Sequence, residues 1–398
     1  MKRIVIVAAK RTPFGRFRGA LAEFSPVELA VIAGEAALQD IDRTLIDQVI
    51  LGNVLAAGQG MNVARQVAIK LNLPVQTPAA TVNMMCGSGM QSALMGVSAI
   101  RAGEAKAVLV GGTESMSRTP LLVTRPAKGQ PPDFTATIDS IQRDGLVCSF
   151  NNGHMAEQAE ELATVFQISR EDQDAFAERS QRLCGAAQLH GELADEIVTA
   201  GKLMADQHPR PEVTRAELAQ LSLAFRQDGS SGTVTAGNAS GINDGAAILV
   251  LAELEFAESN GWPVLAEWIE GVVVGCDPAC MGLGPVHAIR TLFNRTKRDW
   301  KNVDTLEINE AFAAQTLACL REMQLAIDGP TVRTTDGHAM NFNSEGGAIA
   351  LGHPLAASGA RLLTHLAWKI ASGKSASAIG SLCIGGGMGI ASLLSTPP

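Results

Sequence analysis

The sequence predicts an α/β protein built from two similar halves, with a more helical segment inserted into the first half. Strand-like and helix-like segments alternate over roughly the first 115 residues, the pattern changes between residues 118 and 242, and the last third repeats part of the first. Such alternation is typical of a mostly parallel sheet covered by helices. We expect an N-terminal half at residues 1–117 that is completed by 243–265, an insertion at 118–242, and a C-terminal half at 266–398.

The first half shows short apolar runs of strand length separated by helical patterns. Pro26 suits the first turn of a helix, and Leu29 and Ile32 share one apolar face of it. Gly103 is a typical residue for ending the second helix. The expected elements are strands at Ile4–Ala9, Val49–Leu51, Ala79–Met84 and Ala107–Val110, and helices at Ser25–Leu38 and Ser88–Gly103.

The inserted segment begins irregularly and continues as helix. Thr119–Asp133 contains four prolines and little periodicity, so we expect it to leave the main fold. His154–Leu189 has a strongly helical pattern, within which Ser169 is suited to cap a helix with Asp172 three residues on. Strand character resumes at Ala246–Leu251.

The repeat emerges when the chain is shifted by 270 residues. Ser88-Gly89 then falls on Ser358-Gly359, and Gly103 falls on Gly373 without a gap. In both copies a helix runs to the closing glycine and a short apolar strand follows, at Ala376–Gly380 in the second copy. The alternative is a chance likeness between two helices that are rich in alanine and glycine.

Composition excludes several classes of function. The chain has 398 residues, 46% of them hydrophobic, and a formal charge of −8, which disfavours a nucleic-acid-binding protein. No apolar run approaches the roughly 18 residues of a membrane span. The apolar N-terminal stretch is too short for a signal peptide, so we expect a cytoplasmic protein with reduced cysteines. Cys276 and Cys280 have no second ligand pair of matching spacing, so no metal site is expected.

Cys86 lies between a predicted strand and a predicted helix, in the segment Asn83–Met90. A cysteine at this position faces the positive end of the helix dipole, which is expected to lower the thiol pKa and favour the nucleophilic thiolate. The alternative is a small buried cysteine without a chemical role.

His353 closes the glycine-containing segment Gly346–His353, and Pro354 marks the start of a helix. The helix dipole disfavours the imidazolium there, and a neutral ring is what a general base requires. A histidine that only packs or caps the helix is the alternative.

Cys383 opens a run in which four of seven residues, up to Gly389, are glycine. Glycines expose backbone N–H groups, which can bind an anion or a developing oxyanion. No Lys-Ser or Lys-Thr follows, so the run is not a phosphate-binding P-loop.

Asn309 follows the predicted strand Leu306–Ile308 and begins the predicted helix Glu310–Met323. It either caps this helix or holds its amide at the carboxyl end of a strand, where α/β folds place ligands.

Together these segments resemble the thiolase family over essentially the whole chain. The resemblance implies a five-layered α-β-α-β-α core of two duplicated halves with an inserted loop domain, which agrees with the repeat and the change of pattern. The motifs that carry the resemblance are the opening Ile6–Gly15, the Cys86-Gly87-Ser88-Gly89 loop, Asn309–Gln315 (NEAFAAQ), Gly346–Pro354 (GGAIALGHP) and Cys383–Gly387.

The resemblance also implies thioester chemistry on coenzyme A. Cys86 would take an acyl group from acyl-CoA while His353 accepts its proton, and Cys383 would deprotonate a second acetyl-CoA for condensation to a 3-ketoacyl-CoA. The backbone N–H groups of Cys86 and Gly385 would bind one oxyanion, and His353 with a water held by Asn309 would bind the other. Thiolysis is the reverse reaction.

Further residues of the resemblance are expected to contact the substrate, and no cofactor is expected beyond the coenzyme A thioesters themselves. Short-chain members carry a pair like His154-Met155, so two acetyl-CoA condensing to acetoacetyl-CoA is the expected reaction. The expected substrate and CoA contacts are His154, Met155, Arg210, Leu221, Ala236, Ser240, Met281, Ala311 and Phe312.

Two further features follow from the family pattern. Thr119–Asp133 resembles the loop that joins dimers into tetramers, so a homotetramer is expected. Glu345 stands where many members carry asparagine, and its charge is a candidate influence on substrate preference.

Three other functions compete with condensation of two acetyl-CoA. A thiolase of fatty-acid β-oxidation with a broader chain-length range is the nearest. A decarboxylating ketoacyl synthase usually has a Cys-His-His or Cys-His-Asn set, and Cys383 argues against it. A non-catalytic CoA-binding module would not need Cys86, Asn309, His353 and Cys383 together.

Overall fold

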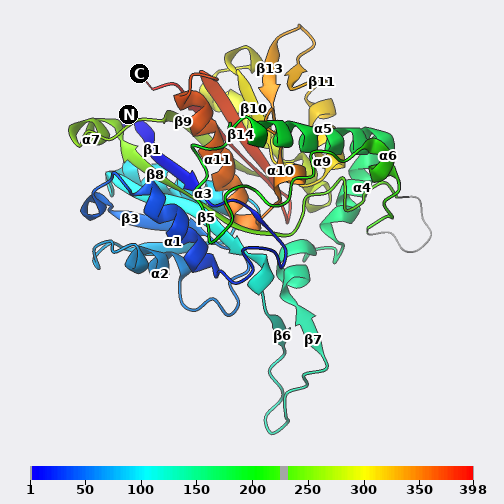
Figure 1. Ribbon diagram of the computed structural model, residues 1–398, viewed down its shortest axis with the longest axis horizontal. Helices are drawn as coiled ribbons and strands as arrows, with labels where there is room; N and C mark the ends of the chain where they lie inside the picture. Colours follow the sequence, from blue (N-terminus) through cyan, green and yellow to red (C-terminus); the bar gives the residue numbers. More distant parts are fainter. Residues whose placement is uncertain (1, 225–231, 398) are drawn as a thin grey trace.

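The computed structural model describes residues 2–224 and 232–397 (Figure 1). Within them, thirteen strands form one hydrogen-bonded sheet, which is joined in the middle by three residue pairs between β1 (Ile4–Arg11) and β9 (Ala266–Gly275). No helix in these two ranges is long and apolar enough to cross a membrane.

The two halves of the sheet repeat one pattern of strand pairing. In the N-terminal half β3 pairs in parallel with β4 and β5, β5 pairs antiparallel with β8, and β8 pairs antiparallel with β1. In the C-terminal half β10, β13, β14, β15 and β9 repeat this pattern in the same order. The strands are β3 (Gln48–Gly52), β4 (Ala79–Val82), β5 (Ala107–Ser115), β8 (Asn243–Glu253), β10 (Thr305–Ile308), β13 (Ala339–Phe342), β14 (Ser377–Ile384) and β15 (Met388–Ser395).

Helices cover both outer faces and fill the space between the two halves, so the core has the expected five layers (Figure 1). Alternate side chains of β1 are buried on opposite faces, with Ile4 and Ile6 toward the central layer and Val5 and Val7 toward an outer one. The outer helices are α1 (Pro26–Ala37) and α2 (Val63–Lys70) on one side and α8 (Gly284–Thr296) and α9 (Ala313–Glu322) on the other, and the central ones are α3 (Ser88–Ala102) and α11 (Leu355–Ala371).

The central helices approach closely because each repeat carries a glycine at the same place. A Cβ atom on Gly89 would lie 2.4 Å from the carbonyl oxygen of Ala356, and one on Gly359 would lie 2.8 Å from the backbone nitrogen of Met90. The 270-residue shift is therefore a real structural repeat: β5 begins at residue 107 and β14 at residue 377.

The insertion differs from the two halves. A hairpin of β6 (Leu121–Val123) and β7 (Thr137–Asp139) projects from the body of the molecule (Figure 1). The strongly helical segment predicted at 154–189 forms two helices, α4 (Met155–Val165) and α5 (Arg170–Leu189). Between them Gln167 has a φ of 52°, and Ser169 and Asp172 form the predicted cap of α5.

The remaining elements are short. They are β2 (Gly15–Arg16), α6 (Arg215–Ala219), α7 (Leu254–Ser259), β11 (Ala326–Asp328), β12 (Thr331–Arg333), α10 (Ala348–Leu351), 3₁₀ turns at Arg43–Leu45, Met116–Arg118, Pro278–Leu283 and Trp300–Asn302, and a π-helical turn at Gln142–Leu146.

Candidate active site

Cys86, His353 and Cys383 line one small cavity of about 150 Å³. Cys86 follows β4 and directly precedes Gly87, the N-cap of α3. His353 directly precedes Pro354, the N-cap of α11, and Cys383 lies near the end of β14. The two halves therefore deliver their helix starts and strand ends to the same place, as α/β folds do for ligands.

Cys86 is a protonated thiol at neutral pH. Burial raises its pKa to about 11, although the backbone N–H groups of Gly385 and of Cys86 itself act in the opposite direction. The predicted lowering of the Cys86 pKa is therefore wrong: the pKa is raised, and burial is the largest cause. A base must remove the proton before Cys86 can attack.

His353 is suited to be that base. Its Nδ1 lies 2.6 Å from Oγ of Ser358, whose hydroxyl donates to the carbonyl of Pro354 at 3.1 Å. Nδ1 therefore carries the ring proton, and Nε2 can accept one. Burial, assisted by Arg361, lowers the pKa of His353 to about 4. The neutral ring that the sequence predicts is confirmed, with burial as its main cause.

Cys383 is buried beside Cys86, and its pKa is raised by burial first and by the charge of Cys86 second. The two sulfurs therefore disfavour simultaneous ionisation, which suits two thiols that work in turn. Gly386 and Gly387 follow with φ of 89° and 85°, so the chain turns sharply here and brings the N–H of Gly385 to Cys86.

Asn309 does not cap a helix. Its backbone N–H donates to the carbonyl of Ser381, and α9 begins only at Ala313 with Phe312 as its N-cap. The side-chain amide is buried, and neither its nitrogen nor its oxygen finds a hydrogen-bond partner within residues 2–224 and 232–397. Nε2 of His353 is likewise unpartnered in this part of the chain. Such buried polar atoms are uncommon and indicate a functional partner.

The wall of the small cavity contains most of the predicted acyl-pocket residues. The ring of His154 accepts a hydrogen bond from the backbone of Ala156 at 3.1 Å and caps α4. Met155 covers the glycine loop so closely that a Cβ atom on Gly385 would lie 2.2 Å from its terminal methyl group. The predicted residues that line this cavity are His154, Met155, Ser240, Met281, Ala311 and Phe312.

A larger cavity of about 690 Å³ lies beside the small one. The two share the segment from Ala239 to Ile242, so one elongated ligand can occupy both. The predicted CoA contacts Arg210, Leu221, Ala236 and Ser240 line the larger cavity.

The comparisons with known proteins agree with this geometry. Residues 4–255 match the family model described as thiolase, N-terminal domain, and residues 262–396 match that of thiolase, C-terminal domain. The chain belongs to the thiolase family.

Individual relatives cover the whole of this thiolase. An acetyl-CoA acetyltransferase of Pseudomonas aeruginosa is 42% identical over 98% of both chains. The crystal structure of human mitochondrial 3-ketoacyl-CoA thiolase in complex with CoA is 38% identical, with a TM-score of 0.92 over 100% of this chain and 98% of the other. That of Bacillus anthracis acetyl-CoA acetyltransferase is 36% identical, with a TM-score of 0.91 over 100% and 99%.

Sequence reasoning missed several cavity residues of this thiolase. Met116, Gln142, Leu146 and Leu355 complete the wall of the small cavity, and no motif in the sequence marks them. His208 lines the outer cavity, where burial and the charge of Arg210 lower its pKa to about 4.

Glu345 does not line the small cavity of the thiolase. Its carboxylate is bound by Lys369, at 2.7 and 2.8 Å, and by His365, at 3.1 Å. The expected influence of its charge on substrate preference therefore has no direct contact with this cavity to support it.

Proposed function

We propose that this thiolase condenses two acetyl-CoA to acetoacetyl-CoA and CoA, and catalyses thiolysis in reverse. The observation that carries the proposal is the shared cavity of Cys86, Cys383 and His353, in which one ring nitrogen of a neutral histidine is unpartnered in the described chain. Two thiols and one base are the groups that an acyl-enzyme route through a carbanion requires.

In the first step Sγ of Cys86 attacks the carbonyl carbon of acetyl-CoA while Nε2 of His353 takes the thiol proton. The C–S bond to CoA breaks, and the sulfur of CoA leaves with the proton that His353 returns. Cys86 then carries the acetyl group as a thioester, and no proton is gained or lost overall.

In the second step Cys383 acts on a second acetyl-CoA. The Cys383 thiol first passes its proton to Nε2 of His353, and the resulting thiolate removes a proton from the methyl carbon. The carbanion that forms attacks the carbonyl carbon of acetyl-Cys86. The bond from Cys86 to the acetyl group breaks, and Cys86 takes its proton from His353. The product is acetoacetyl-CoA, with both cysteines restored.

Two groups of donors stabilise the charge that develops on oxygen. The N–H groups of Cys86 and Gly385 already interact with Sγ of Cys86, so they suit the oxyanion that forms on the acyl group there. The unpartnered amide of Asn309 and Nε2 of His353 suit a water molecule and the enolate oxygen. Loss of one such donor typically costs about 3–4 kcal/mol of barrier.

A short acyl chain is favoured by the small volume of about 150 Å³ and by the position of Met155 over the glycine loop. The second candidate is a 3-ketoacyl-CoA thiolase of fatty-acid β-oxidation with a broader chain-length range. A solved relative of that name is 38% identical over the full chain, so family likeness alone does not separate the two.

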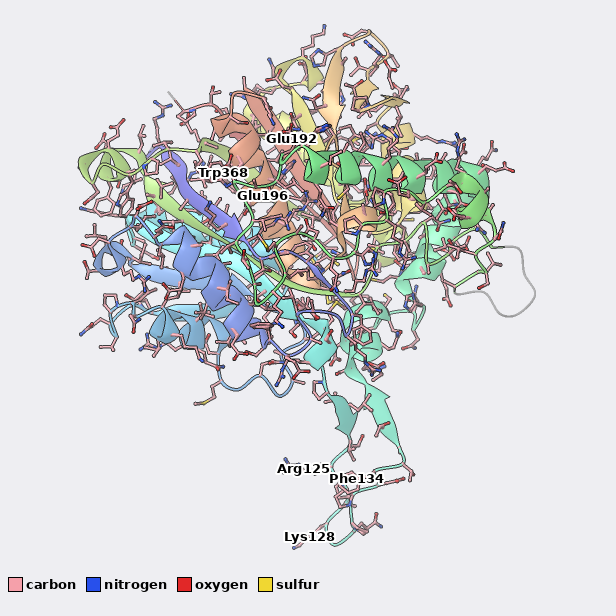
Figure 2. All side chains as sticks on the ribbon, in the orientation of Figure 1. Arg125, Lys128, Phe134, Glu192, Glu196 and Trp368 are labelled. Atoms are coloured by element: carbon pink, nitrogen blue, oxygen red, sulfur yellow. The ribbon has the colours of Figure 1, made fainter. Side chains whose placement is uncertain are left out.

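The wider assignment is also a proposal. The N-terminal half comprises residues 1–117 and 243–265, and the C-terminal half comprises residues 266–398. The insertion at 118–242 holds much of the CoA. No cofactor takes part, and the enzyme works in the cytoplasm. Leu121 and Phe134 of the β6–β7 hairpin are exposed, and they favour contact with other subunits in a homotetramer. Phe134 is labelled in Figure 2.

The direct test offers the enzyme acetyl-CoA alone and follows acetoacetyl-CoA by chromatography. We expect acetoacetyl-CoA to form without any malonyl thioester. A requirement for a malonyl thioester would contradict the proposal, and thiolysis that is much faster with long 3-ketoacyl-CoA than with acetoacetyl-CoA would favour the second candidate.

A further inference from the structure

A chain of charged side chains, all buried except the half-buried Glu345, links four distant segments of this thiolase. Glu345 binds Nε2 of His365 at 3.1 Å, and Nδ1 of His365 lies 2.9 Å from Glu196. Glu196 then accepts from Nε of Arg11 at 2.7 Å, and Arg11 binds both oxygens of Asp206 at 2.7 and 2.9 Å. Figure 2 labels Glu196 and also Trp368, which lies on α11 three residues after His365.

The charges of this cluster balance only when His365 is protonated. Its carboxylates are Glu196, Asp206, Glu307 and Glu345, and its permanent cations are Arg11, Arg361 and Lys369. Both ring nitrogens of His365 face carboxylates, and only an imidazolium can donate from both. These carboxylates raise the pKa of His365 to about 9 although burial acts to lower it.

The other charged groups around His365 lie at the mouth of a cavity of about 240 Å³. Glu192 pairs there with Lys374, and His190 and Asp195 complete the mouth. These four are more exposed than the cluster itself, so solvent screens their effect on His365.

The cluster is not suited to hold a metal ion. Ligand atoms of Glu307, Glu345 and His365 lie within 4.8 Å of one another. However, Lys369 already binds both oxygens of Glu345, and a divalent cation would leave the balanced cluster with excess positive charge.

The segment from Glu345 to His353 is held along its whole length. Gly346 packs against α5, where a Cβ atom would lie 2.6 Å from Cβ of Cys184. Gly347 packs against the carboxylate of Glu310, at 2.3 Å from such an atom. At the far end the backbone N–H of His353 donates to Asn243 at 3.1 Å. The segment is therefore anchored at its start by the partners of Glu345 and at its end by Asn243.

We infer that Glu345 is a positioning residue for His353, held in place by the His365 imidazolium and the Lys369 ammonium. Glu345 is the only carboxylate of the segment 345–353, and its two oxygens accept hydrogen bonds from three side chains, those of Ser344, His365 and Lys369. The cluster thus fixes the start of the segment, and the start of α11 fixes its end. The inference deepens the proposed function, because it rests on His353 being the base.

A pH dependence follows from this arrangement. Above about pH 9 His365 loses its proton, and four carboxylates then face three cations in a buried cluster. The pKa is raised above the unfolded value of 6.5, so the stabilisation is complete below about pH 6.5 and is lost as the pH rises through about 9.

The test compares Glu345→Gln with the matched control Glu178→Gln on α5, which removes one carboxylate from a partly exposed ion pair with Arg215 of α6. Hydrogen exchange of the peptide 346–353 is measured together with the single-turnover rate of acetylation by acetyl-CoA. For Glu345→Gln we expect hydrogen exchange in 346–353 to become about tenfold faster and the half-time of acetylation to become about tenfold longer. The half-saturating acetyl-CoA concentration is expected to stay unchanged. The control is expected to match the wild type.

A second variant separates positioning from stability. Glu345→Gln combined with Lys369→Met restores the charge balance, so its melting temperature should return toward the wild-type value while exchange in 346–353 stays fast. If the double variant regains wild-type exchange and acetylation together with its stability, the inference is wrong. Unchanged exchange in the single variant Glu345→Gln would also overturn it.

The pH profile gives a third readout. The wild-type acetylation rate is expected to fall above about pH 9, and the rate of His365→Gln should not show this fall. The same fall in the variant would contradict the role of His365. Exchange is measured without turnover. A wild-type enzyme that is never acetylated would therefore refute the proposed function, while the exchange data would still decide whether Glu345 holds the segment.

Discussion

Nδ1 of His353 lies 2.6 Å from Oγ of Ser358, and the hydrogen bond from that hydroxyl to the carbonyl of Pro354 assigns the ring proton to Nδ1 and leaves Nε2 as the basic nitrogen. Ser358 in turn donates to the carbonyl of Pro354 at the start of α11. Because the hydroxyl proton is committed to that carbonyl, the ring cannot take the other tautomer without breaking a bond. The sequence repeat places Ser358 where the first half has Ser88.

We predict that Ser358→Ala slows acetylation of the enzyme about tenfold or more. The substitution leaves the Nδ1 proton without a partner and allows the inactive tautomer, at a cost of about 1–3 kcal/mol. Rapid-quench mass spectrometry measures the rate. The exposed Ser372→Ala at the end of the same helix is the control, and equal rates in the two variants would refute the role of Ser358.

The pH dependence of acetylation distinguishes a thiol with a neutral base from a preformed thiolate. His353 stays neutral above about pH 4, and Cys86 stays protonated below about pH 11. The rate should therefore be level between about pH 5 and pH 8 and should fall as His353 becomes charged toward pH 4. A tenfold rise for each pH unit through neutrality would show that only the thiolate reacts.

The repeated core is predicted well because both halves carry the same local sequence signals. Gly103 and Gly373 both end a central helix with positive φ, 81° and 73°, and the following strands begin at equivalent positions. Apolar runs and glycines are local signals, so the strands and helices of both halves can be read without tertiary information.

The errors at the site have tertiary causes. The helix predicted from Glu310 begins at Ala313, because the Glu310 carboxylate is drawn into buried hydrogen bonds with Ser180 and Asn343. The Cys86 pKa depends on burial among side chains that lie far from it in the sequence, such as Leu55, Ile141 and Leu355. Gln142 and Leu146 reach the cavity from a π-helical turn that has no periodic signature.

Met155→Ala should widen the acyl pocket. We expect thiolysis of a medium-chain 3-ketoacyl-CoA to increase roughly tenfold relative to acetoacetyl-CoA, since one or two methylene groups in a pocket are worth about 1–3 kcal/mol each. Relative kcat/KM values measure this. Met204→Ala, whose side chain is 75% exposed, is the control. An unchanged ratio would remove Met155 as a determinant of chain length.

Cys383→Ser should separate the two half-reactions. Acetylation of Cys86 is expected to stay within a few-fold of the wild-type rate, whereas condensation falls at least about a hundredfold, because serine is a poorer base at this buried position. Acetoacetyl-CoA formation and the intact mass of the enzyme are measured in parallel. Cys280→Ser at an exposed position is the control, and equal loss of both steps would contradict the role of Cys383.

The central claim is that Cys86 carries the acyl group, and intact-mass measurement after mixing with acetyl-CoA tests it most directly. The wild-type enzyme and Cys280→Ser should each gain the mass of one acetyl group, which peptide mapping assigns to Cys86 and which hydroxylamine or added CoA removes. Cys86→Ser should gain no such mass. An acetyl group on another residue, or the same labile adduct on Cys86→Ser, would contradict the account.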